Sequence, residues 1–157
     1  MFFRQIVDDR LGCCSYVVAS GNEAAVVDPG YEIGPYERIL AERSLRLRYV
    51  IDTHVHADHV SGGRRLAASH GAELCLHEQA RVSYPARRVR EGQELSIGVV
   101  RLRIMHTPGH RPEMMSVLVT DLERSIEPIA VLTGDSLLVG DAGRPDFSGG
   151  DAFAQYE

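Results

Sequence analysis

The chain has 157 residues, of which 44% are hydrophobic and 25% charged, as expected for one globular domain spanning residues 1–157. The net charge of −5 and the scattered arginines argue against a nucleic-acid partner, and no apolar run approaches the roughly 20 residues of a membrane span or forms a signal-peptide core. Three cysteines make a poor disulfide framework, so we expect a cytoplasmic protein whose cysteines are small core residues.

The first part of the chain has the pattern of a strand meander. Residues 2–6, 14–19 and 24–27 are short β-rich runs separated by charged residues and by the Gly21-Asn22 turn, which predicts antiparallel strands. Residues 35–43 have helical character. Residues 47–51 read as a buried strand that leads directly into Asp52-Thr53-His54.

The middle of the chain predicts a strand, helix, strand unit of α/β type. Ser61 is placed to cap a helix that runs to His70 and stops at Gly71, and residues 73–76 form the next strand. Further strands are predicted at residues 99–105, 116–120 and 129–132. Residues 149–151 predict a turn and a helix cap, with residues 152–157 as the first turn of a helix.

A dense group of metal-binding residue types follows the buried strand. Three imidazoles and a carboxylate lie within residues 54–59, and alternate residues of extended chain project to one side. Two later loops, Thr107-Pro108-Gly109-His110 and Thr133-Gly134-Asp135, each follow a predicted strand and contain a glycine that lets the backbone approach a common point. Imidazole and carboxylate bind zinc, iron and similar ions. The predicted ligands are His54, His56, Asp58, His59, His110 and Asp135.

Other polar residues have structural interpretations. His70 and His77 are expected to lie near the end of a helix and of a strand, and His106 to support the loop that follows it rather than bind metal. Arg144 and Asp146 are expected to form an ion pair that holds the loop after Asp135. Met114 and Met115, next to the same site, either alter the polarity of the pocket or fill the core.

The order His-x-His-x-Asp-His, then a later His and a later Asp, resembles the metallo-β-lactamase superfamily. The resemblance implies an α/β protein, an αββα sandwich with metal at one edge of the sheets. Relatives continue well past residue 157 with further strands and helices, so the sandwich is expected to be incomplete at the C-terminus. The chain would then be a truncated product, a fragment of a longer protein, or a homo-oligomer that completes the sheet between chains.

Within that superfamily, residues 3–6, 107–113 and 134–146 resemble persulfide dioxygenases, most clearly at Gly143-Arg144-Pro145-Asp146. This resemblance implies one Fe(II) per chain, held by the catalytic residues His54, His110 and Asp135. It also implies glutathione persulfide or another low-molecular-weight persulfide and O2 as substrates, and a rhodanese-type sulfurtransferase as partner. The other three predicted ligands would then orient the ligands or bound water by hydrogen bonding.

Two alternatives remain open. A glyoxalase II-like hydrolase of thioesters would bind one or two Zn(II) ions, with His54, His56 and His110 on one ion, Asp58 and His59 on the other, and Asp135 between them. No histidine follows His110 in the sequence to complete the second ion, which favours a single metal. The second alternative is an inactive metal-binding remnant.

Overall fold

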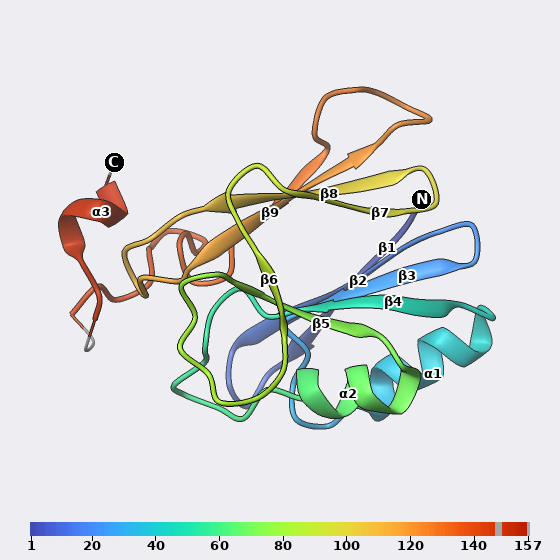
Figure 1. The fold of residues 1–157 in the computed structure, drawn as a ribbon, viewed down its shortest axis with the longest axis horizontal. Helices are drawn as coiled ribbons and strands as arrows, with labels where there is room; N and C mark the ends of the chain where they lie inside the picture. Colours follow the sequence, from blue (N-terminus) through green and yellow to red (C-terminus); the bar gives the residue numbers. More distant parts are fainter. Residues whose placement is uncertain (147–148, 157) are drawn as a thin grey trace.

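The computed structural model describes residues 1–146 and 149–156, which form two β-sheets stacked face to face (Figure 1). The first sheet has the strand order β1-β2-β3-β4-β5-β6, and the second has the order β10-β9-β8-β7. The strands of the first sheet are β1 (Phe2–Asp8), β2 (Cys13–Ser20), β3 (Glu23–Val27), β4 (Arg46–Ile51), β5 (Glu73–His77) and β6 (Arg87–Val89). Those of the second sheet are β7 (Glu94–Ile97), β8 (Val100–His106), β9 (Met115–Asp121) and β10 (Ala130–Leu132).

The first sheet contains both predicted motifs. Its strands β1, β2 and β3 pair antiparallel, whereas β3, β4, β5 and β6 run parallel. Helices α1 (Gly34–Glu42) and α2 (Gly63–His70) lie on the side of this sheet that faces away from the second sheet (Figure 1). The predicted meander and the strand, helix, strand unit are therefore confirmed.

Two apolar layers hold the elements together. Because successive side chains of a strand point to opposite faces, Val26 of β3 packs with the helices while Val27 packs between the sheets. Ile51 of β4 and Leu102 of β8 are fully buried in the layer between the sheets, and Leu66 of α2 is fully buried in the layer beneath the helices. The fold is the predicted α/β sandwich, with its helix layer on the first sheet in the described residues.

Several local predictions need correction. Gly62, not Ser61, is the N-cap of α2; the Ser61 hydroxyl instead accepts the Gly63 N–H and donates to Asp52, both at 2.9 Å. Gly71 ends that helix in the left-handed region, as predicted. Strands β6 and β7 were not predicted, because they are only three and four residues long.

The last helix, α3 (Ala152–Tyr156), follows the predicted cap. Asp151 Oδ1 accepts the backbone N–H of Phe153 at 2.9 Å and of Ala154 at 3.3 Å. The predicted continuation to Glu157 falls outside the described residues. Across residues 1–146 and 149–156, no helix is long and apolar enough to cross a membrane.

The cysteines do not all behave as predicted. Cys75 is fully buried, as expected for a small core residue, but Cys13 and Cys14 are only partly buried. They begin strand β2 and line cavities rather than the core, so the prediction that all three fill the core is wrong for this pair.

Candidate metal centre

Three loops bring His54, His110 and Asp135 to one point. His54 follows β4, His110 lies between β8 and β9, and Asp135 follows β10. Asp135 Oδ2 lies 4.0 Å from His54 Nε2 and 3.6 Å from His110 Nε2, and the two imidazole rings meet edge to face at 5.0 Å. Two ring nitrogens and one carboxylate oxygen therefore converge, which is a donor set suited to iron or zinc.

The orientation of His54 is fixed by Thr53 and by Asp28 at the end of β3. Thr53 donates to the Asp28 carboxylate from its backbone N–H at 2.7 Å and from its hydroxyl at 2.9 Å. Because the hydroxyl proton is used in this way, Thr53 Oγ1 accepts from His54 Nδ1 at 3.1 Å. The unprotonated Nε2 then faces Asp135.

The environment also keeps His54 neutral. Burial, and after it the positive charge of His56, lower the pKa of His54 to about 3. A neutral imidazole is the form that binds a metal ion. For Asp135, burial raises the pKa above its ordinary value, against the opposing effects of His110 and His56.

The loop of residues 134–146 positions His110 as well as Asp135. The carbonyl oxygen of Arg144 accepts a hydrogen bond from His110 Nδ1 at 2.9 Å, which directs Nε2 toward Asp135. The Gly143 N–H donates to the Asp135 carbonyl at 2.8 Å. The predicted ion pair of Arg144 and Asp146 is confirmed, with contacts of 3.0 and 2.7 Å.

Close packing around Gly134 brings the two sheets together at the site. Gly134 has φ +50°, and a side chain there would lie 2.5 Å from Met114 Cε and closer still to Thr53 Oγ1. Met114 and Met115 are both fully buried, so they fill the core rather than alter the polarity of the pocket. The Met115 N–H donates to the Thr53 carbonyl at 2.9 Å, which ties β9 to the loop after β4.

His56 belongs to a different cluster from the converging triad. Its Nε2 lies 3.2 Å from Asp28 Oδ1, and it groups with Asp28 and Asp52. Burial would lower the pKa of His56, but the hydrogen bond and charge of Asp28 outweigh it and raise the pKa to about 9. Burial, and then the charge of Asp28, raise the pKa of Asp52 to about 7. His56 is thus an ion-pair partner of Asp28.

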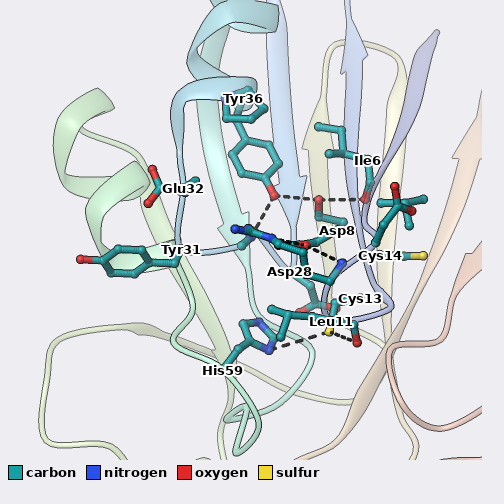
Figure 2. A pocket seen from close by; sticks show the side chains of 16 residues that line it. Ile6, Asp8, Leu11, Cys13, Cys14, Asp28, Tyr31, Glu32, Tyr36 and His59 are labelled. Carbon is teal, nitrogen blue, oxygen red and sulfur yellow. Dashed lines mark hydrogen bonds and ion pairs between the residues drawn. The ribbon is translucent and has the colours of Figure 1, made fainter.

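A third cluster contains the remaining predicted ligands. His59 Nδ1 lies 2.9 Å from Asp58 Oδ1, and Cys13 Sγ lies 3.7 Å from Asp58 Oδ2 and 3.9 Å from His59 Nδ1. These residues line a cavity of about 660 Å³ together with Asp135 and the apolar Leu138. A second cavity of about 530 Å³ also has Cys13 and His59 in its lining (Figure 2).

Sequence reasoning missed three residues of this region. Asp28 was not singled out, Thr53 was treated only as a link to His54, and Cys13 was assigned to the core. Each contributes through a partner remote in sequence: Asp28 and Thr53 are 25 positions apart, and Cys13 and Asp58 are 45 positions apart. One feature of the sequence could have identified Asp28: it directly follows a predicted strand, and the predicted ligands also lie in loops that follow strands.

His106 has the supporting role that was predicted. Its ring stacks on that of His77, with centroids 4.0 Å apart and planes at 10°, and its Nε2 bonds the Pro112 carbonyl at 2.8 Å. Glu113 adds a second support, since it is buried and accepts the Val55 N–H at 3.3 Å. These contacts connect the loop that carries His110 to His77 of β5 and to the Val55 backbone.

Comparison with known proteins agrees with this architecture. Human mitochondrial persulfide dioxygenase ETHE1 is 28% identical over 91% of this chain and 56% of its own length. A hydroxyacylglutathione hydrolase of Anaeromyxobacter dehalogenans is 34% identical over 78% of this chain and 45% of its own length. The crystal structure of ETHE1 from Myxococcus xanthus superposes with a TM-score of 0.87 at 33% identity, covering 99% of this chain and 67% of that one.

The chain spans about half the length of both curated relatives. The sequence model described as the metallo-beta-lactamase superfamily matches residues 8–156, nearly the whole chain. That match includes all three ligand loops and every strand from β2 to β10. This protein chain belongs to the metallo-β-lactamase superfamily.

Proposed function

We propose that the chain carries the metal centre of a persulfide dioxygenase, with one Fe(II) held by His54, His110 and Asp135. The observation that carries this proposal is the convergence of these three donors while His56 is engaged by Asp28. Ferrous iron on two histidines and one carboxylate supplies reactivity toward dioxygen and keeps open positions for a substrate. Similarity to persulfide dioxygenases supports the same choice.

The substrate class would be glutathione persulfide or another low-molecular-weight persulfide. In the overall reaction RSSH, O2 and H2O give RSH, sulfite and two protons: the S–S bond breaks, the outer sulfur is oxidised and dioxygen is reduced. A sulfurtransferase of the rhodanese type is the class of protein that would supply such a persulfide.

The chain's own residues would orient the ligands and shape the cavity. Thr53 and the Arg144 carbonyl hold the two imidazoles with Nε2 toward Asp135, so no reorientation is needed when metal binds. The Asp135 side chain is 42% exposed and borders the cavity of about 660 Å³, which gives a substrate access to the centre. Leu137 and Leu138 add apolar surface to the cavity wall.

A glyoxalase II-like zinc hydrolase of thioesters is the second candidate. The observation in its favour is that Asp58 and His59 line the same cavity as Asp135, where a second ion would lie. Similarity to hydroxyacylglutathione hydrolases supports it as well. An inactive remnant, the third reading, would bind metal and show neither activity.

Two substitutions distinguish a single ion bound by the triad from a metal site in which His56 is also a ligand. We expect His110→Ala to weaken iron binding by more than about 100-fold, because it removes a donor from the triad. His56→Gln should retain about one iron per chain, since glutamine removes the imidazole and its charge but keeps a hydrogen-bond donor for Asp28 and leaves the three donors of the triad in place. Iron content by mass spectrometry after anaerobic purification measures both, with circular dichroism to verify folding. Equal loss of iron from the two variants would contradict the single-ion proposal.

A further inference from the structure

We propose that Cys13 is a third ligand, beside Asp58 and His59, of a second cation site that shares no donor with the triad and takes a soft divalent ion such as Zn(II). None of its donors belongs to the triad, so this site does not depend on the proposed dioxygenase activity. The zinc hydrolase alternative already places an ion on Asp58 and His59; the new element here is the Cys13 sulfur beside them. Cys13 lies at the start of β2, and the fold brings its sulfur next to Asp58 and His59.

The distances between the three donors fit a single ion. Around tetrahedral zinc, bond lengths of about 2.3 Å to sulfur and about 2.0–2.2 Å to nitrogen and oxygen place neighbouring donors about 3.3–3.6 Å apart. Here the sulfur lies 3.7 Å from Asp58 Oδ2 and 3.9 Å from His59 Nδ1, and all three donors lie within 4.8 Å of one another. Small side-chain rotations would close the remaining differences.

The backbone places only one of the two neighbouring cysteines at this site. Cys13 pairs with Asp8 across the β1–β2 ladder, so its backbone is fixed by the sheet. Cys14 is the next residue along β2 and projects to the other face. Figure 2 shows the Cys13 sulfur beside His59, whereas the Cys14 sulfur points away from it. This difference makes Cys14 a matched control for Cys13.

The donor chemistry favours zinc over a hard ion. Thiolate and imidazole are preferred by zinc, whereas magnesium and calcium prefer oxygen. On binding, the Cys13 S–H bond would break, its proton would pass to water and a metal–sulfur bond would form, with no change in oxidation state. The thiolate and the Asp58 carboxylate together balance the charge of a divalent cation. Asp58 is 58% exposed, so water or a ligand from the cavity can occupy the fourth position.

Cobalt(II) provides a spectroscopic test on the intact chain. Metal-free protein is titrated anaerobically with cobalt(II), and the thiolate-to-cobalt charge-transfer band in the near ultraviolet is recorded. We expect the band in the wild type, its loss in Cys13→Ser, and its full retention in Cys14→Ser. His110→Ala should also retain it, because that variant removes a donor only from the triad.

A protection experiment does not require that Cys13→Ser fold. In His110→Ala protein, saturating zinc should slow alkylation of Cys13 by iodoacetamide at least about tenfold while leaving Cys14 unchanged, as peptide mapping would show. The proposal would be overturned by a wild type without the band at saturating cobalt, by a band that survives in Cys13→Ser, or by equal alkylation of Cys13 with and without zinc.

Discussion

The two sides of the metal centre are built differently. On the first sheet, His54 is buried and held by side-chain hydrogen bonds through Thr53 to Asp28. On the second sheet, the side chain of Asp135 is 42% exposed, and backbone groups of Gly143 and Arg144 position this loop and His110. The first side is therefore a rigid ligand platform. The second depends on contacts between loops, and we expect perturbations there to be absorbed more easily.

The largest effect is expected where the two sides touch, at Gly134. Gly134→Ala adds a Cβ against Thr53 and Met114 at a φ of +50°, so it should displace Asp135 and abolish high-affinity metal binding. We expect a loss of about 2–4 kcal/mol in the free energy of unfolding, measured by urea denaturation of metal-free protein.

Gly140→Ala is the matched control in the same loop. Its φ is +80°, but nothing lies within 4 Å of the added Cβ, so it carries only the backbone cost of about 1–2 kcal/mol. Metal affinity should be nearly unchanged. Equal loss of metal binding in the two variants would show that backbone strain, rather than contact between the two sides, determines the position of Asp135.

A smaller effect is expected from the hydrogen bonds on each side. Thr53→Val keeps the shape of the side chain but removes the hydroxyl between His54 and Asp28, so metal affinity should fall about 10–100-fold. Ser136→Ala removes the hydroxyl that bonds Thr107 at 2.7 Å and joins two loops of the other side; here the loss should stay below about tenfold. Competition with a chelator measures both affinities. A larger loss of affinity in Ser136→Ala than in Thr53→Val would contradict our expectation that perturbations on the second side are absorbed more easily.

The smallest effect is expected from the exposed pair of Arg144 and Asp146. Arg144→Ala removes the ion pair with Asp146 but keeps the carbonyl oxygen that accepts from His110. Because exposed ion pairs contribute little, metal affinity should change by less than about threefold in the same chelator assay. A change as large as that of Thr53→Val would show that the side chain itself controls the loop.

Most of the fold, and the three side chains His54, His110 and Asp135 that converge at the candidate metal centre, could be predicted from the sequence. Strand β4 was predicted because its run of apolar residues is buried on both faces, and α2 was predicted to end at Gly71, which adopts the left-handed conformation there. Strands β6 and β7 were missed because three and four residues are too short for an alternating pattern to stand out, even though β7 alternates exposed and buried residues.

The division of the predicted ligands into clusters could not be derived from residue spacing; only the family resemblance set the triad apart from the other three. The division depends on Asp28, which lies 28 residues before His56 and was not singled out, and on Cys13, which was predicted to be a small core residue. Only the folded sheet shows that Asp28 bonds His56 and that Cys13 lies beside Asp58. Tertiary contacts of this kind leave no spacing signal in a single sequence.

The most direct test of the central claim is metal content and oxygen uptake on one sample of anaerobically purified protein. We predict about one iron per chain and oxygen consumption that depends on glutathione persulfide and releases sulfite. Zinc in place of iron, with thioester hydrolysis and no oxygen uptake, would contradict the dioxygenase account and establish the hydrolase. Bound metal with neither activity would contradict both and leave the chain as a metal-binding remnant.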